Sequence, residues 1–137
     1  MEICCDTDKM IRHPDLRTQY AAYVPDPAVV EKLRAAKEPI TVAIIFGVWC
    51  PDSRRIVPEV LKAISEAKND NLQLLTASVP YEETDDLPLD VGGLSVQRFP
   101  TVVLLRGKYQ TTEEIDPSQE ICRFVEESLD AARLSCV

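Results

Sequence analysis

The sequence predicts a single α/β domain, on three observations. The chain has 137 residues, which is the length of one ordinary domain, and 45% of them are hydrophobic, enough to form a core. Short runs rich in β-branched residues alternate with longer segments whose apolar residues recur at helical spacing. The last two short runs are separated only by Arg106-Gly107-Lys108, which predicts an antiparallel hairpin at the end of the sheet.

The first elements follow from caps and apolar runs. Residues 1–25 are mixed and polar, and we interpret them as an N-terminal extension, with a short helix around 16–23, to a domain formed by residues 26–137. Asp26-Pro27 then begins a helix that Pro39 ends, because aspartate is a good cap and proline is favoured at the first helical position. Residues 40–48 predict a strand buried on both faces.

A helix over 51–68, a strand over 72–79 and an acidic loop over 80–90 come next. Pro58 is predicted to kink this helix, because proline removes a backbone donor. After a Gly92-Gly93 turn, the predicted hairpin pairs a strand over 101–105 with one over 109–115. A last helix is predicted from Asp116-Pro117, with an apolar stripe formed by Ile121, Phe124, Val125, Leu129 and Ala132. The first two strands are expected to be parallel.

Charge excludes several classes of function. Lys and Arg number 15 and Asp and Glu 23, so the net charge is −8, and a phosphate backbone or an acidic lipid surface would be repelled. The single histidine, His13, is interpreted as a surface loop residue, and we expect neither a metal nor another cofactor. The longest apolar run is far shorter than the roughly 20 residues of a membrane span, and the first ten residues resemble no secretory signal. We therefore expect a cytoplasmic monomer, although a secreted form whose signal was removed stays open.

Five cysteines stand at positions 4, 5, 50, 122 and 136, and none forms a C-x-x-C pair. This odd, irregular set argues against a disulfide scaffold and against a four-ligand zinc site. Cys122 is interpreted as a core residue of the last helix, whereas Cys136, Cys4 and Cys5 are expected in frayed termini. Whether one of these four acts as a resolving thiol stays open. Cys50 differs, because it lies where a buried strand turns into a helix.

Three features meet around Cys50. Trp49-Cys50-Pro51-Asp52-Ser53 begins a helix, Pro58 lies inside that helix, and Phe99-Pro100-Thr101 begins a later strand. Over about residues 26–134 this combination resembles the thioredoxin superfamily, in which a W-C-x-x-C/S motif begins the first core helix, a proline follows five residues later and a cis-proline loop faces the cysteine. The resemblance implies a three-layer sandwich with a central mixed sheet and helices on both faces. It also implies a cis peptide between Phe99 and Pro100.

The resemblance implies a thiol-disulfide oxidoreductase that acts on protein or small-molecule disulfides and thiols. Cys50 would be the nucleophile, since a helix N-terminus stabilises a thiolate through backbone N–H groups and the helix dipole. The Ser53 hydroxyl would donate to its sulfur, and Pro100 would position the partner. The implied substrate-binding residues are Trp49, Pro51, Phe99 and Thr101.

Two positions depart from the classical pattern. Ser53 stands where a resolving cysteine would, and Ile44 stands where classical thioredoxins carry a buried acid. We therefore expect a monothiol enzyme, and whether Ser53 is natural or replaces a cysteine stays open. The alternative is a redox-inactive binding module with the same fold. Two further interpretations are disfavoured. An iron–sulfur carrier would resemble the C-x-x-S glutaredoxins, whose glycine pair follows the cis-proline, and a calcium site in the acidic loop lacks the spaced ligand pattern.

Overall fold

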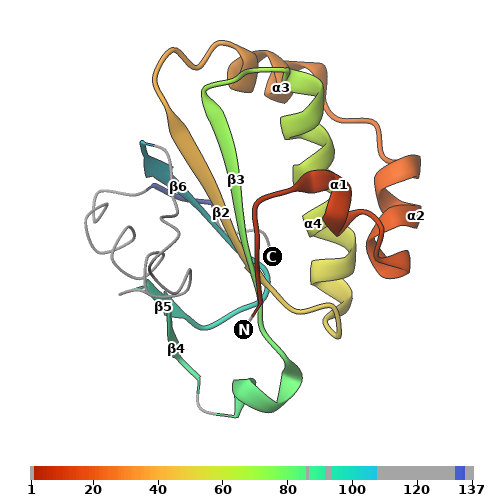
Figure 1. The fold of residues 1–137 in the computed structure, drawn as a ribbon, viewed down its shortest axis with the longest axis vertical. Coiled ribbons are helices and arrows are strands. Elements are labelled where there is room, and N and C mark those ends of the chain that lie inside the picture. Colours follow the sequence, from red (N-terminus) through yellow and green to blue (C-terminus); the bar gives the residue numbers. More distant parts are fainter. Residues whose placement is uncertain (1, 86, 92–93, 108–131, 135–137) are drawn as a thin grey trace.

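A five-stranded mixed sheet is the centre of the fold, in the strand order β1-β3-β2-β6-β7 (Figure 1). The computed structural model describes residues 2–85, 87–91, 94–107 and 132–134. The strands of this sheet are β1 (Glu2–Cys4), β2 (Ile40–Phe46), β3 (Leu72–Ser78), β6 (Thr101–Arg106) and β7 (Ala132–Leu134). The helices are α1 (Thr7–Met10), α2 (Pro14–Ala22), α3 (Pro27–Arg34) and α4 (Pro51–Ala67). The chain is therefore a mixed α/β protein, as predicted.

The centre of the sheet is a parallel pair joined by a helix. β2 and β3 are parallel, with Ile40 opposite Leu72, and α4 connects them. β6 pairs antiparallel with the other edge of β2, with Ile45 opposite Thr101. The predicted parallel pair and the predicted strand at 101–105 are thus confirmed.

The outer edge of β6 differs from our prediction. We assigned that edge to residues 109–115, but at Val102–Leu104 it pairs antiparallel with β7. Ala132, which we placed in the last helix, therefore lies in a strand, because ladder hydrogen bonds outweigh one apolar residue at helical spacing. The remainder of the predicted hairpin strand and last helix lies outside the described residues.

The N-terminal segment forms regular structure, whereas we expected Cys4 and Cys5 to lie in a frayed terminus. β1 pairs antiparallel with β3, so that Cys4 lies opposite Thr76, and the Thr76 hydroxyl donates to the Cys4 carbonyl at 2.8 Å. The expectation that Cys4 is frayed was wrong, because the edge of β3 offers backbone groups that even three residues can pair with. Met10 of α1 and Leu16 of α2 are buried in the same core as the sheet.

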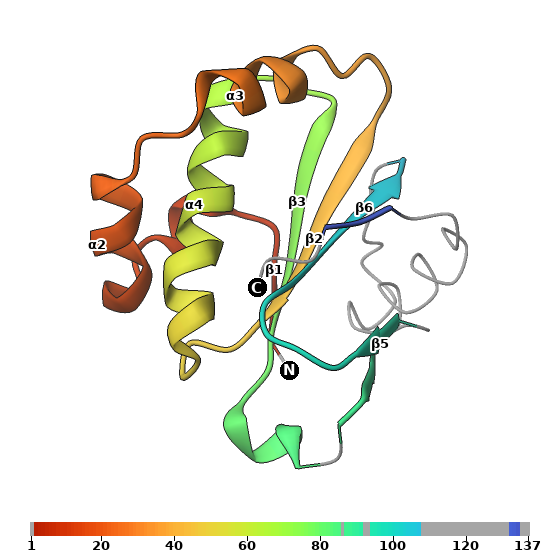
Figure 2. The same cartoon turned by 180° about the vertical axis from the view of Figure 1, so that it is seen from behind.

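All helices of the described residues cover one face of the sheet (Figures 1 and 2). Alternation along β2 separates two cores, since successive side chains of a strand point to opposite faces. Val42, Ile44 and Phe46 pack under the helices with Val57 and Leu61 of α4. On the other face, Ala43 and Ile45 pack with Leu75, Val103 and Val96. The second helical layer that we predicted lies outside the described residues.

A small hairpin and a single helical turn lie beyond β3. The 3-10 turn η1 (Tyr81–Thr84) follows β3, and β4 (Leu89–Val91) pairs antiparallel with β5 (Leu94–Val96). We had predicted only a loop and a turn here. Val96 is fully buried against the sheet, so this hairpin covers part of the second face.

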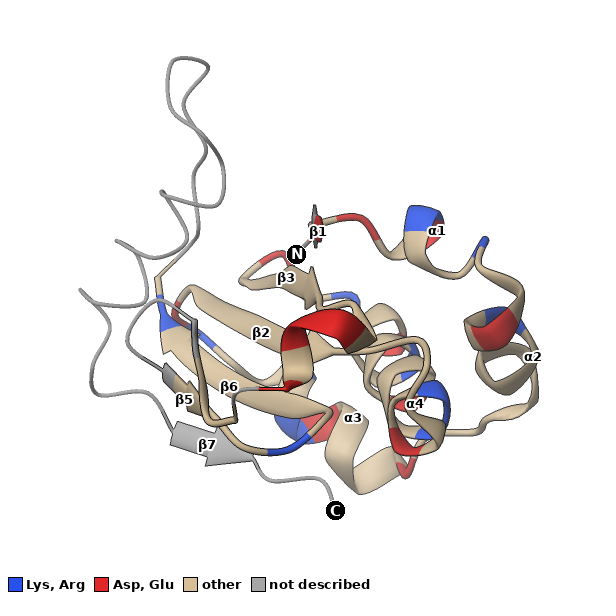
Figure 3. Cartoon of the chain, turned by 90° about the horizontal axis from the view of Figure 1, so that it is seen from below, with Lys and Arg blue, Asp and Glu red and all other residues tan. Residues whose placement is uncertain are grey.

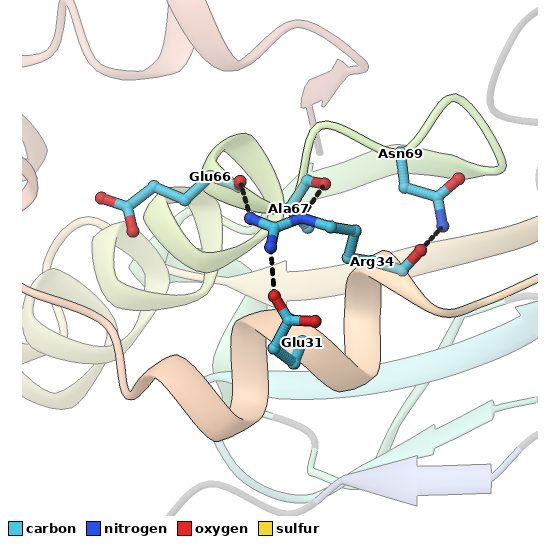
Figure 4. Close-up of polar contacts among 5 residues, drawn as sticks. All are labelled: Glu31, Arg34, Glu66, Ala67 and Asn69. Carbon is cyan, nitrogen blue, oxygen red and sulfur yellow. Dashed lines mark hydrogen bonds and ion pairs between the residues drawn. The ribbon is translucent and has the colours of Figure 1, made fainter.

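Side-chain donors hold together the ends of α3 and α4 (Figure 4). The Arg34 guanidinium donates to the Glu66 and Ala67 carbonyls, at 3.2 and 3.4 Å, and also to the Glu31 carboxylate. Asn69 follows α4, and its amide nitrogen donates to the three carbonyls of Leu33, Arg34 and Ala36 at 2.9–3.1 Å. The last carbonyls of a helix have no partner within the helix, and these two side chains supply one.

α4 itself runs from Pro51 to Ala67 through the buried Pro58. Lys68 then ends it in the left-handed region, with φ 48°. None of the helices in the described part of the chain is long and apolar enough to cross a membrane.

Candidate functional site

Cys50 is the N-cap residue of α4, at the end of the sheet where β2 finishes. Its backbone N–H donates to the Gly47 carbonyl at 3.0 Å, and its own carbonyl accepts from the Arg54 N–H at 3.1 Å. Pro51 then occupies the first helical position, where its missing N–H costs nothing. The strand-to-helix turn therefore fixes the backbone of Cys50 while its side chain stays half-buried.

The loop before β6 lies against this cysteine. The peptide between Phe99 and Pro100 is cis, as predicted. The Cys50 thiol is positioned to donate to the Phe99 carbonyl, with Sγ and O 3.5 Å apart. The fold thus brings together two segments that are 49 positions apart in the chain.

The sulfur does not have the hydrogen bonds that we expected. No side-chain capping bond joins Cys50 to the first N–H groups of α4. Ser53 is fully buried, and its hydroxyl accepts from the Gly47 N–H at 3.3 Å instead of donating to Cys50. The Cys50 sulfur lies against the Phe99 carbonyl because a neutral thiol is a donor and this carbonyl is the acceptor beside it. Ser53 consequently supports the turn that carries Cys50.

Aromatic rings gather around Trp49, the residue before Cys50. The Trp49 indole N–H donates to the Val79 carbonyl at 2.8 Å, which fixes the ring. Phe99 and Tyr81 each form a T-shaped pair with Trp49, with a centroid distance of 5.3 Å in both pairs. Edge-to-face pairs of this kind are favourable. Three rings, from the turn before α4, from η1 and from the cis-proline loop, therefore form one aromatic cluster beside Cys50.

Gly47 makes room for this cluster. A Cβ atom at position 47 would lie 2.4 Å from the Trp49 ring, which real structures do not tolerate. Gly47 is buried and also donates to Ser53. The absence of a side chain at position 47 is thus required for the position of Trp49.

The other predicted site residues lie at the same end of the molecule in different environments. Pro51 is exposed and Pro100 is buried. The Thr101 hydroxyl donates to the Arg98 carbonyl at 2.7 Å, so it stabilises the loop before β6. The Arg54 guanidinium donates to the Val48 carbonyl at 3.0 Å. Ile44 stands at the position where the resemblance to classical thioredoxins led us to look for an acid. It is fully buried among apolar side chains.

Cys4 is distant from Cys50. Register places Cys4 opposite Thr76 and Thr76 opposite Ile44, so Cys4 lies two strands from β2, about 10 Å across the sheet. A disulfide needs Cα atoms within about 7 Å. Cys4 is therefore no resolving partner for Cys50 in this arrangement. Desolvation, with a contribution from Cys4, raises the pKa of the Cys5 thiol. Cys122 and Cys136 lie outside the described residues.

A cavity of about 500 Å³ lies near the N-terminal segment. Its walls include both Cys4 and Cys5, and its apolar floor includes Met10, Leu16 and Phe46. Cys50 does not line it. Within the described ranges, no three His, Cys, Asp or Glu side chains are grouped so that they could hold a metal ion.

Sequence reasoning missed Tyr81 and Gly47. Tyr81 is the aromatic residue that opens the acidic loop directly after a predicted strand, and a strand end next to a candidate nucleophile is a usable signal. Gly47 ends the buried run two residues before Trp49, where a small residue allows a close approach of the indole. Comparison of the chain with protein-family models, with curated proteins and with solved structures gives no match.

Proposed function

We propose that the protein is a monothiol thiol-disulfide oxidoreductase of thioredoxin type, with Cys50 as its nucleophile. The observation that carries the proposal is the contact between the Cys50 sulfur and the Phe99 carbonyl, made at the N-terminus of α4. A cysteine at a helix N-terminus, facing a proline loop from a distant strand, is the arrangement that the W-C-P-D-S and Phe99-Pro100-Thr101 motifs imply in the thioredoxin superfamily. Half-burial leaves the sulfur accessible to a second sulfur atom.

The helix N-terminus suits the nucleophile. Ionisation removes the proton that the thiol donates to the Phe99 carbonyl. The thiolate can then no longer form this hydrogen bond. The N–H groups of Asp52 and Ser53 are in the first turn of α4, where helical N–H groups lack partners within the helix. A thiolate that rotates toward these groups is stabilised by them and by the helix dipole.

The proposed reaction is thiol–disulfide exchange. The Cys50 thiolate attacks one sulfur of a substrate R–S–S–R′, a new S–S bond joins Cys50 to R–S, and the old bond breaks with its electron pair on R′–S⁻, which takes a proton from water. An external thiol R″SH, as its thiolate, then attacks Cys50 and releases R–S⁻. A second equivalent frees Cys50 and leaves as R″–S–S–R″. Two external thiols are thus oxidised for each disulfide reduced.

Two buried residues support the monothiol form of this reaction. Ser53 cannot attack the mixed disulfide, and Ile44 offers no carboxylate to move a proton. Cys4 does not replace the missing thiol, as the strand register indicates. We therefore propose release by an external thiol.

The test is formation of a mixed disulfide with oxidised glutathione, read by intact mass and peptide mapping. We expect one glutathione adduct, at Cys50, which is lost in Cys50→Ser and kept in Cys5→Ser. Addition of reduced glutathione should remove it. An adduct confined to other cysteines, with Cys50 unmodified, would overturn the proposal.

A second candidate function is a redox-inactive binding module, and the environment of Ser53 favours it. The Ser53 hydroxyl accepts from Gly47 and so helps to hold the turn below Trp49, a role that needs no chemistry at Cys50. A folded protein that forms no adduct at Cys50 under the same conditions would support this candidate.

A further inference from the structure

We infer that the surface around Tyr81 is a docking site for a basic segment of a polypeptide substrate, in which an Arg or Lys side chain lies on the Tyr81 ring. This inference deepens the proposed function and rests on it for the idea that the polypeptide carries a disulfide. The binding surface itself is argued from the aromatic cluster and the charges around it.

Tyr81 is unusual in being both exposed and connected to the site. Tyr81 is 63% exposed, although its ring packs against Trp49 in a T-shaped arrangement. Trp49 in turn contacts Phe99, whose carbonyl faces the Cys50 sulfur. A group bound on Tyr81 therefore lies on a continuous surface that leads to the thiol.

Hydrogen bonds hold Tyr81 in place. The Thr84 hydroxyl donates to the Tyr81 carbonyl at 2.6 Å, and the Glu83 N–H donates to the Pro80 carbonyl at 3.0 Å. The indole against which Tyr81 packs is fixed by its bond to Val79. An aromatic ring that is held in an exposed position offers contact area at little conformational cost.

The charges on this side of the thiol are acidic. Glu82 and Asp85 are exposed beside Tyr81, and Asp52 is exposed in the first turn of α4. Figure 3 shows the molecule from this end, with acidic residues in red on the turn after β3 and at the start of α4. Among nearby cations, Arg54 donates to the Val48 carbonyl, Arg55 is exposed on α4, and Arg98 is exposed one position before Phe99.

These features select a cationic side chain. An aromatic face attracts Lys or Arg, by roughly 0.5–1 kcal/mol at an exposed site, which corresponds to about two- to fivefold in affinity. The flanking carboxylates and the net charge of −8 add long-range attraction for a basic partner and repel an acidic one. The same net charge disfavours a second copy of this chain as the occupant.

The binding test uses Cys50→Ser, so that no disulfide forms, and two fluorescent cysteine-free peptides, one rich in Arg and one of equal length rich in Glu. Fluorescence anisotropy should show binding of the basic peptide only, weakening as salt is added. Tyr81→Ala should weaken it about two- to fivefold, while Tyr81→Phe keeps the ring and the affinity. The pair Glu82→Gln and Asp85→Asn should weaken binding and flatten its salt dependence, whereas Glu38→Gln and Val24→Ala, far from the site, should not.

Several outcomes would overturn the inference. Equal binding of both peptides, or unchanged affinity in Tyr81→Ala, would exclude selection of a basic segment there. Sedimentation that shows a dimer lost in Tyr81→Ala would identify the surface as a self-association site instead. Failure of the inference and failure of the proposed function are distinguishable. A glutathione adduct at Cys50 without peptide preference overturns only the inference, whereas peptide binding without any adduct overturns only the oxidoreductase.

Discussion

The two ends of α4 are built for different purposes. At its C-terminus, Arg34 and Asn69 supply donors to carbonyls of α4 and α3, so polar backbone groups there are bonded to side chains. At its N-terminus, Cys50 is the cap residue and makes no side-chain capping bond. A serine, threonine or aspartate at this position would satisfy a backbone N–H and contribute roughly 0.5–2 kcal/mol. The chain forgoes that stabilisation where it places its thiol.

This contrast teaches that stability and chemistry are separated along one helix. α2 and α3 each have a side-chain N-cap, from His13 and Asp26, so the chain uses side-chain caps elsewhere. Around Cys50 the stabilising interactions come instead from Gly47, Ser53 and Trp49, which hold the turn and the rings without occupying the sulfur. Changes at the two ends should therefore have different consequences.

The largest expected effect follows from supplying a resolving thiol. Ser53→Cys should raise the turnover of insulin disulfide reduction by roughly hundredfold, because release of the mixed disulfide becomes intramolecular and effective concentrations in such geometry are large. Turbidity of insulin with dithiothreitol measures it. Covalent adducts at Cys50 should accumulate on a non-reducing gel for the unaltered protein and not for Ser53→Cys.

Cys136→Ser is the matched control for this prediction. It should change turnover in neither background. Equal turnover of the unaltered protein and Ser53→Cys, lost only when Cys136→Ser is added, would mean that the C-terminal cysteine resolves the intermediate.

The next effect concerns the order of thiol reactivity. Iodoacetamide should label Cys50 about tenfold faster than Cys5 near pH 7.5, because the raised pKa of Cys5 keeps less of that thiol in the reactive thiolate form. The pKa of Cys5 is raised, so this thiol stays protonated at pH values that would ionise an ordinary cysteine. The rate at which Cys5 is labelled should therefore keep rising as the pH increases past the ordinary cysteine pKa of about 8.5. Mass spectrometry of partly labelled protein gives the rates. Faster labelling of Cys122 than of Cys50 would contradict this order.

The sequence predicted the parts of the fold that have a period or a cap. The apolar run of β2, the stripe of α4 and the Asp26-Pro27 start of α3 each carry a local signal, and each element is present. β1 has only three residues, too few to show a periodic apolar pattern. It is a strand because it pairs with β3, and the local sequence does not encode that pairing. The same holds for β7.

The site was predictable in its members and not in its contacts. The resemblance stated from the sequence implied Trp49, Cys50, Phe99 and Pro100 as site residues, and these residues do lie together. The direction of the Cys50 sulfur depends on an acceptor 49 positions away, and the bond of Ser53 to Gly47 depends on the shape of the turn. Tyr81 joins the cluster only because η1 folds back beside Trp49.

Gly47→Ala tests how the N-terminal end of α4 holds Trp49 in position. The new methyl group overlaps the Trp49 ring, so the indole must move and lose its bond to Val79, at a cost of about 1–2 kcal/mol in unfolding free energy. Since the chain has one tryptophan, its fluorescence reports this directly. Gly107→Ala is the control. Gly107 has φ 87° and open space around it, so a side chain there should destabilise through backbone strain alone and leave the emission spectrum unchanged.

The last expected effect lies at the other end of α4, where Asn69→Asp removes donors and keeps the acceptor. The Asn69 side-chain oxygen accepts from the Asn71 N–H at 2.9 Å, and aspartate can do the same. The donations to Leu33, Arg34 and Ala36 are lost, and a carboxylate faces the negative end of the α3 dipole. We expect a loss of about 1–2 kcal/mol in urea unfolding. Asn71→Asp removes only one donation to Ala36 and should cost less. Both variants should label at Cys50 as fast as the unaltered protein, and slower labelling in either would show that the two ends of α4 are coupled.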